Sequence, residues 1–509
     1  MKNENDQVIF FSSQAIIVLM GLVVENIIKY GFTIVLGRSL GAGALGIFFI
    51  GIAVITFVTT ISKFGIDAGA VRYVSMYNSK GEAGKGLGVF FHSVKVSFFI
   101  SILVSSILVF FAGRISGMVS RDPETAGVIR SLSLTVPVST FIFMAVAYFQ
   151  ANLKMKYQVY VISVIQPILN IIIFICLLFV MPRLWAAVWS YALSFLCAAL
   201  AAIYFLKNIL GIFNQRPDYN YERRGLMAQS TWVFLILILG FFIRGADTFI
   251  LGHFRSAAEV GVYNVAMRGA AICGILSTTF ISIFAPAVSR LHSQNNRVEL
   301  SVLFKTINRW ILSLTLPVFV LFMVYPSQIL TIFGRDFNSG SSAFMILSAS
   351  FLFVSLSDTV AYSLLAMTGN IKLSFYNNLA GAVTAIFLNI ALIPRYGIVG
   401  AAAANLASFS LMGILTVSEV YLLFKMHPYH FDLLRPVLAG AAAYGILIVL
   451  KNYSNLFAWH SVLIHICLAM SVYTLIVGLH KKDRQVLRAL KDNLVFNYGS
   501  VSGLFGFLR

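Results

Sequence analysis

Two basic residues lie inside apolar runs at matching points of a duplicated chain. Lys29 occurs in VVENIIKYGFTIVLG and Arg244 in LGFFIRGADTFILG, at an offset of 215 residues (244 − 29). The same offset relates Thr33 to Thr248, Gly37 to Gly252 and Gly46 to Gly261. A charge within hydrocarbon costs roughly 3 kcal/mol or more, so it rarely persists without a partner or a function. Two such charges on an internal repeat predict one central site that holds an anion.

Other ionisable residues in apolar runs indicate the net charge of that site. The deep cations are Lys29, Lys95, Arg244 and Arg268; the acids are Glu25 and Asp247, with Asp358 alone in a later run. Each of the first two acids lies three or four residues from a cation, so local neutralisation on one helix face is an open alternative. Two cations stay unpaired even then, and buried positive charge requires an anion. Because Arg offers two parallel donors and Lys a point charge, a diphosphate group fits these cations.

The composition is that of a protein with many membrane-spanning segments. Hydrophobic residues make up 59% of the chain and charged residues 11%, with a mean hydropathy of +0.89; soluble domains are about a quarter charged. The formal net charge is +19, which in a soluble protein would suggest nucleic acid. Here the cations fall mostly in short loops, so they indicate topology and we expect no nucleic-acid partner. The four cysteines lie in apolar runs without a ligand cluster, so we expect no metal site or disulfide.

A span requires about 20 apolar residues, and the chain contains fourteen such candidates. They cover approximately 9–36, 42–63, 90–112, 126–150, 158–181, 184–206, 228–252, 260–287, 307–327, 342–367, 372–394, 397–424, 434–450 and 459–480. We therefore predict an all-α polytopic fold. Lys and Arg concentrate in the segments that are cytoplasmic when both termini are inside, which is the orientation that the positive-inside rule favours.

The internal repeat divides these candidates into two lobes. The offset of 215 residues pairs the first span with the seventh, so equivalent spans have the same orientation in the membrane. A second stretch agrees, because the run from Asn152 resembles the run from Asn370 and aligns Asn170 with Asn389. We predict pseudo-symmetric six-helix lobes at 1–210 and 228–425, a cytoplasmic linker at 211–227, and two further helices with a tail at 426–509. Prolines at 137, 167 and 317 lie mid-span and predict kinks.

Motifs for enzymatic chemistry are missing from the sequence. It contains no GxxxxGK[ST], HExxH or GxSxG pattern, so we expect neither an enzyme nor a nucleotide-driven pump. A membrane enzyme would carry catalytic residues in large outer loops, whereas the longest ones expected here, near 113–126 and 328–341, are short. A purely structural membrane protein would have no reason for repeated ionisable groups at depth. Energy is expected from an ion gradient or from the substrate's own gradient, with no cofactor.

Several motifs resemble the polysaccharide-export branch of the multidrug/oligosaccharidyl-lipid/polysaccharide (MOP) exporter superfamily, which includes Wzx-type oligosaccharide flippases. They are LGRSLGAGALGIFFIGIAV and FGIDAGAVRYVSMY in the first half, and DTFILGHFRSAAEVGVYNVAMR and GIVGAAAANLAS in the second. The likeness covers most of residues 10–425. It implies two lobes around a cavity that opens to alternate sides, and an undecaprenyl-diphosphate-linked oligosaccharide as substrate. It also implies cationic residues in that cavity, which Lys29, Arg244 and Arg268 match.

The resulting hypothesis is a flippase that moves a polyprenyl-diphosphate-linked glycan across the cytoplasmic membrane. We expect Lys29, Arg244, Arg268 and Lys95 to bind the diphosphate. Glu25, Asp247 and Asp358 are expected to pair with these charges or to couple transport to H⁺ or Na⁺. A monomer is expected, because one pair of lobes forms a complete pathway. The alternative is a cation-coupled multidrug or small-molecule antiporter of the same superfamily, although an excess of cavity cations repels a cationic cargo.

Overall fold

A computed structural model gives the arrangement of the chain. It describes residues 4–208, 211–212, 216–275, 277, 288, 291–294, 296–368, 370–429, 431–453 and 459–477. At 4–17, 19, 358–359, 366–367, 371, 453 and 459–463 the description covers the backbone alone. Within these residues every regular element is helical, which confirms the predicted all-α fold.

The helices follow each other along the chain in two series. The first half forms α1 (Glu4–Lys63), α2 (Ile66–Ser79), α3 (Ala83–Val119), α4 (Glu124–Ser133), α5 (Thr135–Ala151), α6 (Met155–Gln158), the π-helix η1 (Val159–Ile165), α7 (Gln166–Leu177) and α8 (Arg183–Asn208). The second half forms α9 (Arg223–Phe254), α10 (Ala257–Ala270), α12 (Arg297–Val324), α13 (Pro326–Thr331), η3 (Arg335–Gly340), α14 (Ser341–Met367), α15 (Ile371–Phe424), η4 (Phe431–Leu433), α16 (Leu434–Tyr453) and α17 (Trp459–Val477).

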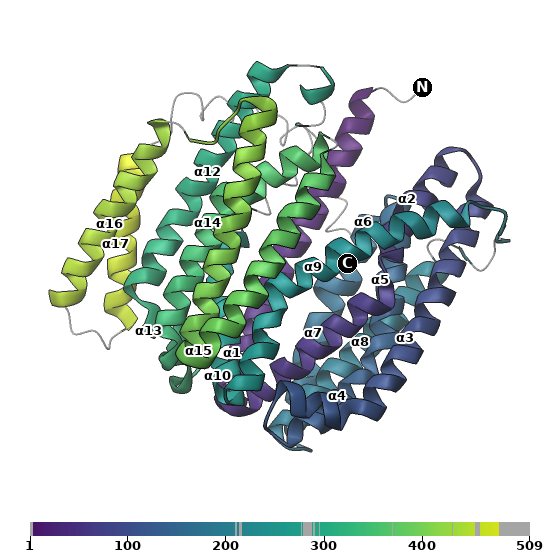
Figure 1. Ribbon diagram of the computed structural model, residues 1–509, viewed down its shortest axis with the longest axis horizontal. Helices are drawn as coiled ribbons and strands as arrows, with labels where there is room; N and C mark the ends of the chain where they lie inside the picture. The colour runs from purple at the N-terminus through teal and green to yellow at the C-terminus, as the bar shows by residue number, and fades with distance from the viewer. Residues whose placement is uncertain are drawn as a thin grey trace, which may run out of the picture.

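Figure 1 shows two groups of helices with a central set between them. One group, the first bundle, contains α2 to α8, and the second bundle contains α12 to α17. The central helices α1, α9 and α10 pack on one another, and α9 also contacts α2 on one side and α15 on the other. This arrangement places the two repeat-related segments, in α1 and α9, at the centre of the molecule. The predicted lobe boundaries stay a prediction.

Long apolar helices make this a multi-pass membrane protein. Among the described residues nine helices are long and apolar enough to cross a membrane, or ten if the bent pair α4 and α5 is one span. Two of them, α1 and α15, each cover two of the predicted spans, and the predicted span at 260–287 lies partly outside the described residues. The count of fourteen therefore stays a prediction.

Glycine explains why two predicted spans can share one continuous helical segment. Gly41 within α1 has φ 69° and ψ 178°, and Gly397 within α15 has φ 55° and ψ −130°. Positive φ is readily adopted only by glycine, because it lacks a Cβ. The helix is therefore kinked at each glycine, and one predicted span follows the other with no intervening loop.

The predicted kink at Pro137 occurs, and a neighbouring helix compensates for it. Helices α4 and α5 meet at a bend of 40°. Proline has no N–H, so the carbonyl of Ser133, four residues earlier, loses its helical partner. The Ser105 hydroxyl on α3 donates to that carbonyl at 2.7 Å. In a membrane such compensation is required, because no water is available to bond a free carbonyl.

Pro317 shows the same compensation in the second half. It lies inside the continuous helix α12 and leaves the carbonyl of Ser313 without its helical donor. Tyr473 on α17 donates its hydroxyl to this carbonyl at 2.9 Å. The bond ties α17 to α12 within the second bundle. Pro167 instead follows the π-helix η1, at the first turn of α7.

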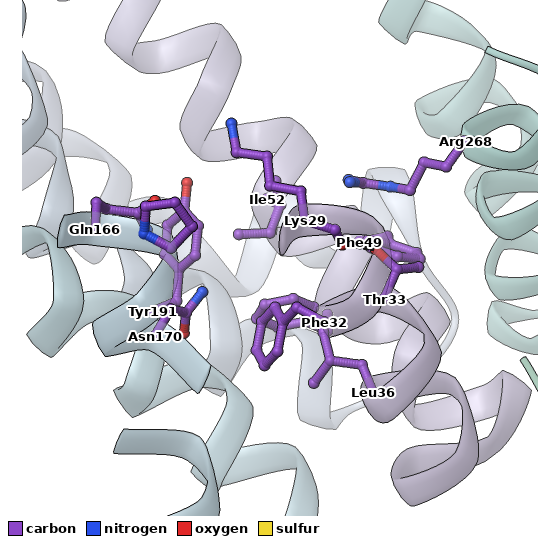
Figure 2. Close-up of a pocket in the computed structure, with 12 residues that line it drawn as sticks. Lys29, Phe32, Thr33, Leu36, Phe49, Ile52, Gln166, Asn170, Tyr191 and Arg268 are labelled. Atoms are coloured by element: carbon purple, nitrogen blue, oxygen red, sulfur yellow. Dashed lines mark hydrogen bonds between the residues drawn. The ribbon is translucent and has the colours of Figure 1, made fainter. Parts of the chain in front are cut away.

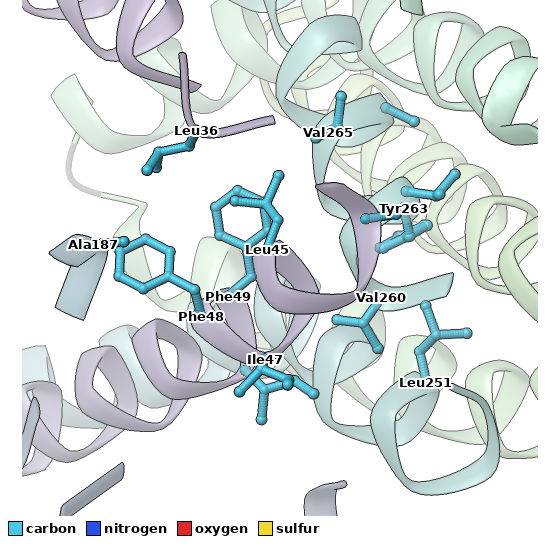
Figure 3. Close-up of a cluster of buried hydrophobic side chains, with 14 of the residues drawn as sticks. Leu36, Leu45, Ile47, Phe48, Phe49, Ala187, Leu251, Val260, Tyr263 and Val265 are labelled. Atoms are coloured by element: carbon cyan, nitrogen blue, oxygen red, sulfur yellow. The ribbon is translucent and has the colours of Figure 1, made fainter. Parts of the chain in front are cut away.

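The two halves of the chain meet where α1 crosses α10. Side chains from both halves form one buried cluster there, including Leu45, Phe49, Val260 and Tyr263 (Figure 3). Small residues bring the backbones into contact, since Gly46 packs against the start of α10 and Gly261 against α1. Burial of apolar surface adds little between helices already in lipid, so close packing of small residues is the main source of attraction.

Two hydrogen bonds related by the repeat tie the same end of the molecule. The Arg38 guanidinium donates to the Ile332 carbonyl at 2.8 Å, and the His253 ring lies 2.7 Å from the Met118 carbonyl. Positions 38 and 253 again differ by 215, and each bond joins one half of the chain to the other. We refer to this region, with Gly46 and Gly261 at its centre, as the closed end.

Candidate functional site

A cavity with a partly polar lining lies between the central helices and the first bundle, next to the closed end. Its volume is about 190 Å³. The polar lining residues are Lys29 and Thr33 from α1, Gln166 and Asn170 from α7, Tyr191 from α8 and Arg268 from α10. The apolar lining includes Leu36 and Phe49. Figure 2 shows Gln166, Asn170 and Tyr191 on one side of the cavity and Arg268 on the other, with Lys29 between them.

The Lys29 side chain lines the cavity and is paired with an acidic residue. Its ammonium forms an ion pair with Glu25, one helical turn earlier, and its side chain is 48% exposed. The second Glu25 oxygen accepts a hydrogen bond of 2.7 Å from the Ser163 hydroxyl in the π-helix η1. Glu25 therefore connects α1 to the first bundle and holds Lys29 beside the cavity. The i,i+4 neutralisation that the sequence left open is present at this pair.

The Arg268 side chain also lines the cavity, but it has no acidic partner among the described residues. Its guanidinium carbon lies 4.5 Å from the centre of the Phe49 ring, a cation–π contact between the two halves of the chain. Within the described part of the chain, Arg268 forms no salt bridge with a carboxylate. Since Glu25 offsets Lys29, the cavity lining carries a net positive charge that comes from Arg268. An anion in the cavity would therefore be attracted by Arg268, which has no acidic partner among the described residues, and by Lys29, which is paired with Glu25.

Two other predicted cations lie elsewhere. Arg244 is exposed on α9, with its guanidinium 6.0 Å from the centre of the Phe409 ring of α15. Lys95 is exposed on α3. Neither lines the cavity that contains Lys29 and Arg268. The repeat relation between Lys29 and Arg244 therefore does not bring these two side chains to the same cavity.

Asp247 forms no ion pair with Arg244 among the described residues, although the two lie only three positions apart on one helix. It is 2% exposed, and its carboxylate accepts from the Tyr263 hydroxyl at 2.6 Å and from the Thr248 amide at 2.7 Å. Asp247 is thus buried and hydrogen-bonded within the protein, whereas Arg244 is exposed. Asp358 lies in α14, and its side chain is outside the described residues.

The amide and aromatic residues of the cavity were missed by sequence reasoning. Gln166 and Asn170 are one helical turn apart on α7, and Tyr191 follows on α8. A signal was present, because IQPILNIII places two amides at i and i+4 within an otherwise apolar span. Side chains at this spacing share a helix face. Uncharged amides give a weaker signal than ionisable groups within an apolar span, because their presence in hydrocarbon costs less.

Metal binding has no support in the described side chains. Among them, no three His, Cys, Asp or Glu residues are grouped so that they could hold a metal ion. The cavity lining itself contains no carboxylate, thiol or imidazole among the described side chains. Its chemistry is that of cations, amides, hydroxyls and aromatic rings, which suits a polar anionic ligand.

Comparison with known families identifies the chain. The sequence model described as "Polysaccharide biosynthesis protein" matches residues 12–292, and the model described as "MatE" matches residues 233–391. The chain belongs to the polysaccharide biosynthesis protein family. The resemblance to the MOP exporter superfamily is thereby confirmed.

Individual relatives agree with this assignment. The chain is 25% identical over 455 residues to the probable low-salt glycan biosynthesis flippase Agl15 of Haloferax volcanii, an alignment that covers 88% of this chain and 91% of the relative. The fold is similar to that of the lipid II flippase MurJ in an inward closed conformation, with a TM-score of 0.74, 16% identity, and coverage of 90% and 97%. An inward-facing multidrug resistance MATE transporter gives a TM-score of 0.65, 14% identity, and coverage of 81% and 98%.

Proposed function

We propose that this protein is a flippase that carries a polyprenyl-diphosphate-linked oligosaccharide across the cytoplasmic membrane. One observation supports the proposal above all: Lys29 and Arg268, from the two halves of the chain, line one cavity whose Arg268 has no counter-charge among the described residues. Such a cavity attracts an anion, and the relatives include a probable glycan biosynthesis flippase. Within this proposal Lys29 and Arg268 hold the diphosphate, while Arg244 and Lys95 lie outside that contact.

Movement of the substrate is proposed to follow alternating access. The diphosphate enters from the side that carries the N-terminus, which we assign to the cytoplasm on the distribution of Lys and Arg. The polyprenyl chain stays in the lipid, because transfer of its apolar surface into a polar cavity is unfavourable. The closed end then separates and releases the glycan on the other side, so the lobes rock around a fixed central site. The protein works as a monomer and as a transporter, with no catalytic step.

An ion gradient is the proposed source of energy. Glu25 serves as the charge partner of Lys29, since the pair is already formed. Asp247 is the coupling residue, because it is a buried carboxylate that can exchange a proton or Na⁺ as its environment changes. Its two hydrogen-bond donors, Tyr263 and Thr248, lie on the central helices α10 and α9 that the conformational change would move.

The proposal is tested by removal of one positive charge at a time. The variants Lys29→Gln and Arg268→Gln are reconstituted in vesicles, and translocation of a polyprenyl-diphosphate oligosaccharide is measured. Each substitution should reduce the rate at least about tenfold, because a charge-assisted hydrogen bond to phosphate contributes about 1.5–3 kcal/mol. Lys95→Gln is the matched control: it removes the same charge from an exposed position outside the cavity and should keep the wild-type rate.

Two results would contradict the proposal. If both cavity variants transport the lipid at the wild-type rate, the cavity cations do not bind the diphosphate. If the wild-type protein instead carries a cationic drug in exchange for ions and leaves the lipid in place, the chain is an antiporter. Size-exclusion profiles of all variants establish that the proteins are folded.

A further inference from the structure

The wall of the cavity opposite Arg268 has unused hydrogen-bonding capacity. Asn170 is 5% exposed, its carbonyl oxygen is buried without a partner, and its side chain makes no hydrogen bond within the described chain. Gln166 uses its amide nitrogen on the Ser194 hydroxyl at 3.1 Å, which leaves its carbonyl oxygen for another donor. A buried polar group without a partner costs about 1–3 kcal/mol. A group kept at this cost inside a cavity is a place where a ligand completes the hydrogen bonds.

The neighbouring aromatic residue adds a flat apolar surface to this wall. Tyr191 lies beside the two amides in Figure 2, and its hydroxyl has no hydrogen-bond partner among the described residues. The ring itself is held in place by Phe195 and Phe48, with centroids 4.8 and 6.2 Å away. A fixed aromatic face with adjacent amides offers apolar contact and both donors and acceptors to the same ligand.

We propose that Gln166, Asn170 and Tyr191 bind the first sugar of the glycan, the one attached to the diphosphate. This inference rests on the proposed function. A sugar in that position is covalently joined to the anion, so it must lie close to Lys29 and Arg268, across the same cavity. Its hydroxyl groups both donate and accept, as the two amides require, and its C–H face packs on an aromatic ring. The cavity volume of about 190 Å³ is comparable to that of one sugar ring.

Recognition of this kind gives specificity as well as affinity. A site built to hydrogen-bond hydroxyl groups discriminates strongly against an analogue that lacks them, because its own buried polar groups then stay unpaired. Lys29 and Arg268 do not discriminate between sugars, because they bind the diphosphate that every such lipid carries. The two walls therefore have separate roles, because one retains any polyprenyl diphosphate and the other distinguishes lipids that carry a suitable sugar.

The repeat supplies a matched control for the experiment. Asn389 is the repeat equivalent of Asn170, it is 3% exposed, and its carbonyl oxygen is likewise buried without a partner. It does not line the cavity. Replacement of either asparagine by leucine removes an unpaired buried amide with a side chain of the same branching, so stability should be maintained or improved in both variants. Only the substitution at 170 should affect the ligand.

The test measures equilibrium binding of two probes to the full chain in lipid nanodiscs. The probes are polyprenyl diphosphate and the same lipid with one sugar, either a hexose or an N-acetylhexosamine. Wild-type protein should bind at least one glycosylated probe more tightly than the bare lipid. Asn170→Leu and Gln166→Leu should each weaken that binding about fivefold, the equivalent of one neutral hydrogen bond. Both should leave the affinity for the bare lipid unchanged, and Asn389→Leu should leave both affinities unchanged.

The outcomes separate this inference from the proposed function. Equal weakening of both probes by Asn170→Leu, or equal wild-type affinity for glycosylated and bare lipid, overturns the sugar assignment while the flippase proposal stands. Failure of wild-type protein to bind either lipid overturns both. Thermal unfolding of each variant guards against misfolding: a binding loss in Asn170→Leu with an unchanged or higher midpoint supports ligand contact, and a similar binding loss in Asn389→Leu contradicts it.

Discussion

Gly46 and Gly261 pack against each other although 215 residues separate them in the chain. A Cβ placed on Gly46 would lie 1.7 Å from the carbonyl oxygen of Ala257, and one on Gly261 would lie 2.1 Å from that of Ala42. The two contacts are equivalents, because 42 and 257 also differ by 215. The small-xxx-small pattern thus occurs on both helices of one crossing, and it permits the backbones to touch.

We predict that Gly46→Ala opens the closed end. The added methyl group has no space beside a backbone carbonyl, so α1 and α10 must separate and the alternating equilibrium moves away from the closed arrangement. A change of about 1.4 kcal/mol alters that equilibrium about tenfold, and translocation should fall accordingly. The check is thiol labelling from the outer side of a cysteine placed at Leu36, in a background without the four native cysteines.

Gly43 provides the control for this substitution. It lies three residues before Gly46 on the same helix, and a Cβ there would meet nothing within 4 Å. Gly43→Ala should therefore leave both labelling and translocation as in the wild type. Equal labelling of the two alanine variants would mean that the crossing does not control access.

Removal of the Glu25 charge should strengthen anion binding. In Glu25→Gln the Lys29 ammonium no longer shares its charge with a carboxylate, so it is free for the diphosphate. Because the ion pair is partly exposed, its contribution is about 0.2–1 kcal/mol, and affinity for polyprenyl diphosphate should rise by a factor between about 1.4 and 5. Binding measured alongside translocation checks the prediction; slower release should lower turnover. An unchanged or weaker affinity would show that the main role of Glu25 is to position Lys29, and that Glu25 does not compete with the diphosphate for the Lys29 ammonium.

The Ser105 hydroxyl should stabilise the fold only when residue 137 is a proline. We expect Ser105→Ala to lower the free energy of unfolding by about 1 kcal/mol, since it leaves the Ser133 carbonyl without a donor. With Pro137→Ala in addition, the backbone amide at 137 can bond this carbonyl, and the cost of the Ser105 substitution should nearly vanish. A double-mutant cycle by thermal unfolding in detergent measures the coupling. Equal costs in the two backgrounds would refute this account of the kink.

Asp247→Asn should uncouple transport from the ion gradient. The amide oxygen still accepts from Tyr263, so the packing of α9 on α10 is retained, but the side chain no longer exchanges a proton or Na⁺. Translocation rates are compared with and without an imposed proton or sodium gradient. The wild type should respond to one of the two gradients and the variant to neither. A variant that keeps the full response would remove Asp247 from the coupling step.

Much of the fold followed from the sequence because local physics determines it. Long apolar runs become helices wherever lipid excludes water, since only a helix satisfies its own backbone groups. Spacing within one helix was also informative: Glu25 and Lys29 at i,i+4 form the ion pair that the sequence left open as an alternative. Pro137 marked the bend between α4 and α5, although the Ser105 hydroxyl that compensates for it came from a helix that local reasoning cannot choose.

The sequence by itself determined the helical class, the family, the internal repeat and the presence of cations within apolar spans. The tertiary structure alone decided which cations share a cavity: Arg268 lines the same cavity as Lys29, while Arg244 lies near the Phe409 ring. It likewise decided that Asp247 accepts a hydrogen bond from Tyr263. It also decided that two amides of α7 face those cations. The reason is that hydrogen bonding and spacing fix neighbours along one helix, whereas the rotation of a helix about its axis depends on side-chain packing with distant segments.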